Sequence, residues 1–332
     1  MTVPIFDAHL DLAMNACRGR DVLLPAARQP VVEGEIATVG LPDLRAGGVR
    51  HVCAVIFCEP HFGEKSTGYK TAEEAYAMAR VQLAIYQQWH AAGEIRINGL
   101  AGDDSAIDAL LLMEGADAIR TPADLGFFAA AGVRVIGLSW HATRYAGGTG
   151  EPGPITPLGR ELVGEIDRLG LIHDASHLAE ESFWNLDDLA ARPIIATHSN
   201  CRAVVGDDPR ERHLTDAMIR RVVEGGGVIG INFYDQFLLP AGESGRRRAT
   251  LDDVIRHINH ICDIAGDAEH VGLGTDMDGG LGREQIPQEI VTSADLPKVY
   301  DALLAAGFDE PAARGIMGEN WFNFFERALT PE

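Results

Sequence analysis

Eight short apolar segments, separated by stretches of helical character, constrain the fold of this chain more than any other feature. They lie at residues 3–9, 50–57, 109–115, 133–140, 170–176, 193–199, 226–233 and 270–276, and helical patterns occupy 71–93, 161–170, 214–226 and 251–266. Near-continuous apolar strands that alternate with helices indicate a parallel sheet covered on both faces. Eight such strands favour closure into a barrel. We therefore predict an α/β protein, a single (β/α)8 TIM barrel domain over residues 1–332.

The sequence also indicates which end of the barrel is functional. Several helical patterns end on a glycine just before the next strand, as in RLGLIHD, EGGGVIG and AAAGVRVIG. This is C-cap chemistry followed by a strand, so it marks the amino ends of the strands. Polar residues that close the strands mark the opposite end, where barrel active sites lie. The irregular segment 18–48 is expected to form a loop at that mouth, and the arginine run in 245–253 is expected to be solvated.

Charge and composition exclude several classes of function. Lys and Arg total 28 against 49 Asp and Glu, which gives a formal net charge of −21. Such a chain has no basic surface for nucleic acid and is repelled by anionic membranes. The five cysteines are loosely spaced and form no C-x-x-C pair, so we expect reduced thiols. Neither a secretory leader nor an apolar run of about 20 residues is visible, so the expected compartment is the cytoplasm.

Imidazoles and carboxylates stand where the predicted strands end. His9 and Asp11 are two apart in an extended segment, so both side chains point to the same side. Glu114 leaves a buried apolar strand directly, where an unpaired carboxylate would be costly. The complete set of strand-end candidates is His9, Asp11, Glu114, His177, His198 and Asp276. Because zinc binds imidazole nitrogen and carboxylate oxygen, the set predicts a zinc site at the carboxyl ends of the strands.

A single histidine or acid at a strand end is more often a cap or a hydrogen-bonding group than a metal ligand. The joint occurrence of these residues on several strands is hard to explain by capping alone. His173 is four residues before His177, so we keep it as a candidate that supports the metal site from below. The remaining histidines that we weighed lie in helical or loop patterns and are expected to be structural or exposed: His51, His61, His90, His257 and His260.

At this point the strand-end motifs resemble those of the membrane dipeptidase (renal dipeptidase) family, peptidase family M19. The resemblance covers nearly the whole chain, and its order of motifs is highly specific. It runs through FDAHLDL (6–12), MEGAD (113–117), HDASH (173–177), ATHSNCRAV (196–204), RHLTD (212–216), GGVIGINF (226–233) and HVGLGTDMDG (270–279).

The resemblance implies two zinc ions per chain and a role for each matching residue. His9 and Asp11 would bind one zinc ion, His177 and His198 the other, and Glu114 would bridge the two. Asp276 would be the acid/base that transfers the proton. Arg212 would bind the carboxylate of the substrate, and Arg210 competes for that role because the spacing departs from the family pattern.

One departure bears on the substrate. Mammalian members of the family carry a substrate-binding His where this chain has Trp140, and the adjacent His141 is the candidate to replace it. Adjacent strand residues point in opposite directions, so Trp140 would instead form a wall of the pocket.

The implied activity is hydrolysis of dipeptides, including those with a C-terminal D-residue, by a homodimer. The alternatives are a related binuclear-zinc amidohydrolase acting on another small amide or lactone, and a catalytically weak binding protein. An intact Asp276 argues against the binding protein.

Overall fold

A computed structural model of the chain describes residues 3–63, 67–100 and 106–329, so the ends of the predicted domain lie outside the described residues. Eight strands form a parallel barrel in the order β10-β11-β1-β2-β4-β5-β8-β9. A bridge between Ala196 and Ile229 joins β9 to β10 and closes the ring. The predicted (β/α)8 barrel is therefore confirmed. The barrel strands are β1 (Ile5–Leu10), β2 (Val49–Phe57), β4 (Ile107–Glu114), β5 (Val133–Gly137), β8 (Ile172–Asp174), β9 (Ile194–Ile195), β10 (Ile229–Ile231) and β11 (Val271–Leu273).

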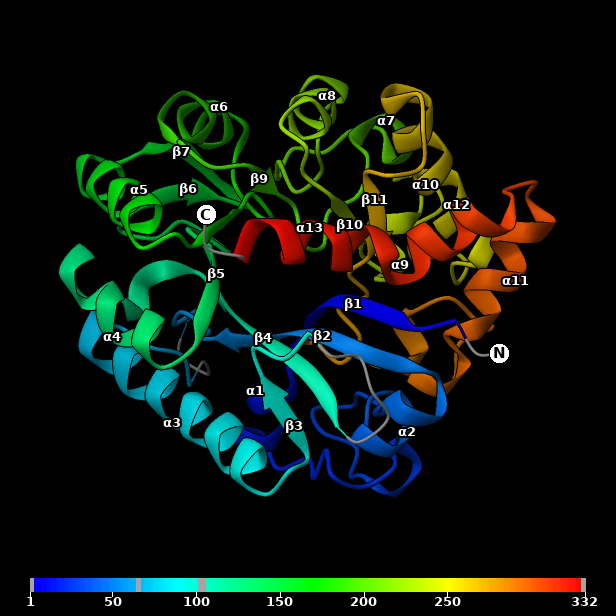
Figure 1. Ribbon diagram of the computed structural model, residues 1–332, viewed down its shortest axis with the longest axis horizontal. Coiled ribbons are helices and arrows are strands. Elements are labelled where there is room, and N and C mark those ends of the chain that lie inside the picture. The colour runs from blue at the N-terminus through cyan, green and yellow to red at the C-terminus, as the bar shows by residue number, and fades with distance from the viewer. Residues whose placement is uncertain (1–2, 64–66, 101–105, 330–332) are drawn as a thin grey trace.

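Helices surround the ring of strands, and α13 lies across it (Figure 1). The four predicted helical patterns correspond to α3 (Ala72–Ala91), α5 (Pro157–Arg168), α8 (Asp216–Glu224) and α10 (Leu251–Ala265). Three of them, α3, α5 and α8, begin at a threonine whose side chain accepts a backbone N–H of the first turn. The other α-helices are α1 (Leu12–Cys17), α2 (Leu41–Ala46), α4 (Leu125–Ala130), α6 (Glu180–Leu189), α7 (Arg202–Val205), α9 (Asp235–Leu238), α11 (Pro297–Ala305), α12 (Glu310–Arg314) and α13 (Asn320–Leu329). The π-helical segment η6 (Gly315–Glu319) precedes α13, and short 3-10 turns complete the chain at η1 (Ala26–Arg28), η2 (Ala116–Ala118), η3 (Pro122–Asp124), η4 (Arg283–Gln285) and η5 (Ser293–Asp295).

Several strands are shorter than the apolar pattern predicts, and some strands were missed. The segment predicted at 170–176 is a strand only over Ile172–Asp174, because the Asp174 carboxylate accepts the backbone N–H of Ser176 and turns the chain. The short strand β3 (Ile95–Ile97) pairs with β4 outside the ring. A hairpin of β6 (Ala146–Gly148) and β7 (Glu151–Ile155) follows β5, in a glycine-rich segment that carries no apolar strand signal.

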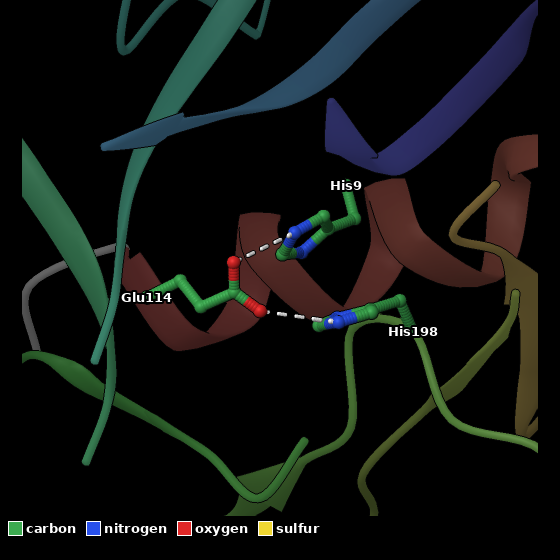
Figure 2. Close-up of side chains that lie close together, drawn as sticks. All are labelled: His9, Glu114 and His198. Carbon is green, nitrogen blue, oxygen red and sulfur yellow. Dashed lines mark ion pairs between the residues drawn. The ribbon is translucent and has the colours of Figure 1, made fainter. Parts of the chain in front are cut away.

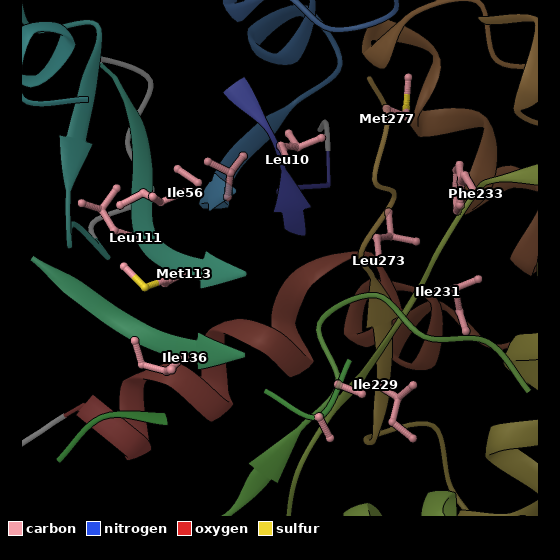
Figure 3. Packing of buried hydrophobic residues seen from close by; sticks show 14 of the residues in the cluster. Leu10, Ile56, Leu111, Met113, Ile136, Ile229, Ile231, Phe233, Leu273 and Met277 are labelled. Carbon is pink, nitrogen blue, oxygen red and sulfur yellow. The ribbon is translucent and has the colours of Figure 1, made fainter. Parts of the chain in front are cut away.

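Two layers of apolar side chains hold the barrel together. Side chains that face outward from the strands pack against the surrounding helices; Leu10, Ile56, Leu111, Met113 and Ile136 are among them (Figure 3). A second cluster fills the interior and includes Phe6, Ala8, Cys53, Val55, Leu110, Leu112, Val135 and Ile172. This arrangement buries both faces of the sheet, as expected for a parallel barrel.

The last helix closes one end of the barrel. Trp321, Phe324 and Phe325 of α13 belong to the interior cluster, and Phe325 stacks on Phe6 with the ring centroids 5.3 Å apart. A Cβ on Gly272 would lie 2.4 Å from the Trp321 indole, so only glycine fits in β11 at this position. Because α13 covers the amino ends of the strands, their carboxyl ends remain free to form a site.

The segment 18–48 is held at the carboxyl ends of the strands by buried charge. Arg20 is buried, lies 3.4 Å from Asp278 and donates to Asn15. Asp278 also accepts the backbone N–H groups of Thr38 and Val39. The expected loop at the mouth is thus tied to the chain that follows β11. In the arginine run, by contrast, the side chains are not simply solvated, since Arg247 forms a bidentate pair with Asp253 on α10.

Among the described residues, no helix combines the length and the apolar character needed to cross a membrane.

Candidate metal centre

Four side chains from four strand ends converge at the carboxyl end of the barrel. His9 lies in β1 and Glu114 is the last residue of β4, whereas His177 and His198 follow β8 and β9. One oxygen of Glu114 lies 3.6 Å from Nε2 of His9, and the other lies 3.2 and 3.3 Å from Nε2 of His177 and His198. One carboxylate oxygen of Glu114 points toward His9 and the other toward His198, and the two imidazole rings lie next to each other with their centroids 3.6 Å apart (Figure 2).

His9 also belongs to a second group of possible ligands. Its Nε2 lies 3.8 Å from a carboxylate oxygen of Asp11. Ligand atoms of His9, Asp11 and Asp276 all lie within 4.8 Å of one another, and so do those of His9, Glu114 and His198. The two groups share one imidazole, so the geometry offers adjacent positions for cations.

Several atoms that could bind a metal ion are buried and have no hydrogen-bond partner among the described residues. These atoms are Nε2 of His9, Oδ1 of Asp11 and Oε1 of Glu114. Nε2 of His177 lies 2.9 Å from Nε2 of His198, and two such lone pairs need a proton or a cation between them. Buried polar groups are rarely left unsatisfied, because each costs free energy. The nitrogen and oxygen donors match the preferences of zinc, so the residues fit a metal centre.

Burial dominates the electrostatics of the site. It raises the pKa of Glu114 to about 8, although the Arg212 guanidinium opposes the shift. Burial likewise raises the pKa of Asp11 to about 7 and of Asp276 to about 8, and His9 opposes both shifts. The pKa of His198 lies well below its usual value because burial disfavours the imidazolium. The neutral His198 imidazole has a free lone pair, and the buried carboxyls ionise readily only when a positive charge lies nearby. Such a group of side chains is suited to bind a cation.

Asp276 is placed by two neighbours that the sequence did not single out. Nδ2 of Asn232, at the end of β10, donates to Oδ2 of Asp276 over 2.9 Å. A Cβ on Gly279 would lie 1.9 Å from Oδ1 of Asp276. Asp276 itself has a left-handed φ of 57°, which turns its side chain toward the centre after β11 ends. The only hint in the sequence is that Asn232 closes an apolar strand.

Hydroxyl groups support the outer nitrogens of the histidine rings. Thr197 Oγ1 lies 3.2 Å from Nδ1 of His9 and 3.0 Å from Nδ1 of His198. Thr149 Oγ1 lies 3.0 Å from Nδ1 of His177. Both threonines were missed from the sequence. Thr197 lies in a strand pattern, where a threonine carries no separate signal, and Thr149 lies in the turn of the glycine-rich β6–β7 hairpin.

A cavity of about 660 Å³ opens beside the ligands. His141 and Trp140 both line it, so Trp140 forms a wall, but the expected opposite directions of the two side chains are wrong, because β5 ends at Gly137 and neither residue lies in the strand. Nδ1 of His141 lies 3.1 Å from Glu151, in the β6–β7 hairpin. The volume suits a small substrate rather than a long peptide.

The two candidate arginines differ in their environment. Arg210 lines the cavity. Arg212 is buried, donates to the carbonyl of His198 over 2.6 Å and to the hydroxyl of Ser199 over 3.1 Å, and leaves its Nε without a partner among the described residues. Its guanidinium lies over the Phe237 ring, 5.0 Å from the centroid. Both cations are thus close enough to the site to bear on an anionic substrate.

The expectation for His173 is wrong. Its Nε2 lies 2.9 Å from the Asp167 carboxylate on α5, so the ring points out of the barrel. Strand parity failed here because β8 ends at Asp174 and His177 adopts a left-handed φ of 67°. The expectation that His51 lies in a helical or loop segment is also wrong, because it is part of β2 and its ring stacks on Phe6. His257 is structural, as expected, and is buried with Nε2 near the carbonyl of Leu238.

Comparisons with known proteins agree with this geometry. The sequence profile of the membrane dipeptidase family (peptidase family M19) matches residues 1–330. A protein of Klebsiella pneumoniae, described as uncharacterised and encoded in the 5′ region of pqqA, is 35% identical over 260 residues, which cover 72% of this chain and 92% of that protein.

Solved structures extend the similarity to the whole chain. The dipeptidase AC, a metallopeptidase of family M19, superposes with a TM-score of 0.83 at 31% identity, covering 99% of both chains. A metallopeptidase of Rhodobacter sphaeroides, liganded with a phosphinate mimic of the dipeptide L-Ala-D-Ala, gives a TM-score of 0.82 at 30% identity and covers 99% of this chain and 100% of that one. The chain therefore belongs to the membrane dipeptidase family, peptidase family M19, and is a peptide-bond hydrolase.

Proposed function

We propose that the chain is a zinc-dependent dipeptidase whose substrates include dipeptides with a C-terminal D-residue. His9 and Asp11 would hold one zinc ion, His177 and His198 a second, and Glu114 would bridge them. The observation that carries the proposal is the convergence of these five buried side chains. Ligand atoms of His9, Asp11 and Glu114 have no hydrogen-bond partner in the described part of the chain.

Two bound zinc ions would supply a water of lowered pKa and would polarise the carbonyl of the scissile amide. The side chains of the protein itself would carry out the proton transfer. Asn232 occupies Oδ2 of Asp276, which leaves Oδ1 to face the site. We assign to Asp276 the removal of the proton from the attacking water and its delivery to the leaving amine nitrogen. In the metal-free protein, burial raises the pKa of Asp276 to about 8. Nearby cations would favour the ionised carboxylate, which can accept the proton.

Arginine recognition of the substrate carboxylate would restrict the enzyme to short substrates. Arg212 remains our candidate, because its Nε is buried with no hydrogen-bond partner among the residues that the structure describes, and its charge acts on Glu114 and Asp276. Arg210 competes because it lines the cavity. A guanidinium matches a carboxylate in both shape and charge. His141 is the second substrate-binding candidate and lines the cavity together with Trp140.

The expected stereochemistry follows from a relative rather than from the site itself. The Rhodobacter sphaeroides metallopeptidase has been solved with a mimic of L-Ala-D-Ala, and this chain resembles it over its full length. The cavity of about 660 Å³ can enclose such a molecule. L-Ala-D-Ala is therefore the first substrate to test.

A dipeptide screen with zinc-reconstituted protein tests the activity. We expect turnover of dipeptides with a D- or L-residue at the C-terminus, and loss of turnover after chelation. Turnover of a small amide or lactone without dipeptide hydrolysis would instead support the alternative amidohydrolase function.

The two arginines can be separated by pairing enzyme variants with amidated substrates. Amidating the C-terminus of a good dipeptide should lower kcat/KM. The decrease should correspond to roughly 2–5 kcal/mol of transition-state stabilisation, as expected on removing one member of a buried charge pair. Arg212→Met should cost a similar amount on the free acid and little more on the amide, with Arg210→Met as the matched control. If the losses in kcat/KM from Arg212→Met and from amidation simply add, whereas those from Arg210→Met and amidation do not, Arg210 binds the carboxylate.

A further inference from the structure

One buried hydroxyl joins two of the proposed metal ligands. Thr197 is fully buried, and its Oγ1 lies 3.2 Å from Nδ1 of His9 and 3.0 Å from Nδ1 of His198. The same oxygen lies 2.5 Å from Oδ2 of Asp174. The two histidines come from strands on different parts of the barrel, so this hydroxyl is a point at which their orientations are coupled.

The hydrogen bonds of Asp174 determine where the hydroxyl proton goes. Oδ1 of Asp174 accepts the backbone N–H groups of Ser176 and Thr197, both at 2.9 Å. Its Oδ2 is therefore an acceptor for the Thr197 hydroxyl, which has one proton to donate. Once that proton is directed to Asp174, Oγ1 accepts hydrogen bonds, and the two imidazoles lie nearer to it than the Ser176 hydroxyl at 3.5 Å. Both rings then carry their proton on Nδ1, and in the metal-free protein the proton between His177 and His198 belongs to Nε2 of His177.

This tautomer is the one that a metal centre requires. With Nδ1 protonated, Nε2 of each ring presents its lone pair, and both Nε2 atoms face Glu114, at 3.6 Å for His9 and 3.3 Å for His198. In most metal sites, each histidine has a separate partner on its other nitrogen. Here one hydroxyl serves two rings.

The position of Thr197 is itself tightly defined by its neighbours. A Cβ on Gly230 would lie 2.0 Å from the Thr197 carbonyl oxygen, and one on Gly274 would lie 1.7 Å from it. The glycines of β10 and of the segment after β11 thus let the backbone of Thr197 approach the centre of the barrel. Any larger residue at either position would displace the hydroxyl from the rings.

We propose that Thr197, oriented by Asp174, is a positioning residue that sets the Nδ1–H tautomer of both His9 and His198 before a metal binds. The proposal rests on the metal site of the proposed function, and it adds the means by which two of its ligands are prepared together. Without the hydroxyl, each ring would lose its fixed tautomer and part of its orientation, and metal affinity should fall by roughly 10–100-fold.

Long-range ¹H–¹⁵N NMR on the metal-free protein tests the tautomers directly, independently of activity. We expect Nδ1–H signatures for both His9 and His198 in the wild-type protein. Thr197→Val, which keeps the shape and removes the hydroxyl, should abolish that uniform preference, and Thr197→Ser should restore it. An Nε2–H tautomer at either ring in the wild-type protein overturns the proposal.

Asp174→Asn gives a second test with a specific signature. The amide oxygen must face the two backbone N–H groups, so the amide NH₂ would face Thr197 and donate to its hydroxyl. The hydroxyl proton would then turn toward one imidazole and force that ring into the Nε2–H tautomer. Unchanged tautomers at both rings in Asp174→Asn would refute the proton assignment.

Thr275→Val is the matched control. Thr275 donates its hydroxyl to the buried Asp7 and precedes Asp276 as Thr197 precedes His198, yet no histidine nitrogen contacts its hydroxyl among the described residues. It should therefore leave both tautomer signatures as in the wild-type protein, and a change as large as that in Thr197→Val would overturn the proposal. Zinc titration of the same variants separates the proposed function from the role of Thr197. Wild-type protein that binds no zinc would contradict the proposed function, whereas the NMR signatures still decide the role of Thr197.

Discussion

His257 should make the stability of the metal-free protein depend on pH in a calculable way. Its ring is fully buried, Nδ1 accepts the backbone N–H of Cys201 over 3.1 Å, and Nε2 lies 3.1 Å from the carbonyl of Leu238. Both nitrogens are satisfied only when the ring is neutral and protonated on Nε2. A second proton would sit against the Cys201 N–H.

The size of the effect follows from the pKa. Burial lowers the pKa of His257 from 6.5 to about 4, although the hydrogen bond to Leu238 opposes the shift. Because the folded protein holds the ring neutral, its contribution to stability is complete above pH 6.5 and is lost as the pH falls from 6.5 toward 4. The difference of about 2.5 pKa units corresponds to about 3 kcal/mol in the free energy of unfolding.

Urea unfolding of the metal-free protein between pH 7 and pH 4 measures this loss. His257→Gln is the comparison, because an amide can replace both hydrogen bonds but does not titrate. The wild-type protein should lose about 3 kcal/mol more than this variant over that range. His260→Gln, on the more exposed side of α10, controls for the loss of a histidine as such. Parallel curves for the wild-type protein and His257→Gln would refute the reasoning.

Three further predictions concern the centre itself. Asp276→Asn should keep the zinc content and the fold, measured by metal analysis and circular dichroism, while kcat falls by about 10²-fold or more, the size of a lost general acid/base; near-wild-type kcat with the metals retained would assign the proton transfer elsewhere, with His141 as the next candidate. Gly279→Ala should also lower kcat more than zinc content, because its Cβ would lie 1.9 Å from Oδ1 of Asp276 but 3.0 Å from Oδ2 of the proposed ligand Asp11, which has to shift much less; equal losses of both would indicate general disruption of the site. Glu114→Gln should lower zinc content and rate together, because a neutral amide bridges two cations poorly, and full zinc occupancy in this variant would exclude the bridging role.

Much of the fold follows from patterns of neighbouring residues. Apolar strands and helical stretches alternate along the chain, and the barrel strands lie within or close to the predicted segments. The exact bounds did not follow, because polar side chains end the strands early. Asp174 turns the chain after β8, which shortens that strand and also defeats the parity argument for His173. The β6–β7 hairpin escaped because its glycines carry no apolar signal.

The proposed metal ligands stood out because imidazoles and carboxylates are conspicuous at the ends of apolar strands. The residues that orient these ligands and Asp276 could not be recognised in the sequence, since their contacts join residues far apart in the chain. Thr197 contacts a histidine 188 residues away, and Asn232 contacts an acid 44 residues away. A threonine or asparagine at a strand end is ordinary until the fold shows what it contacts. The role of Arg210 relative to Arg212 was likewise open, because side-chain direction decides which one lines the cavity.

Zinc titration of metal-free protein, with activity on L-Ala-D-Ala followed at each step, tests the central claim most directly. Five convergent ligands, with one Glu114 oxygen near His9 and the other near His177 and His198, predict that metal content rises to about two zinc ions per chain and that full activity requires both. Stoichiometry that never exceeds one zinc ion in fully active enzyme would contradict the binuclear centre.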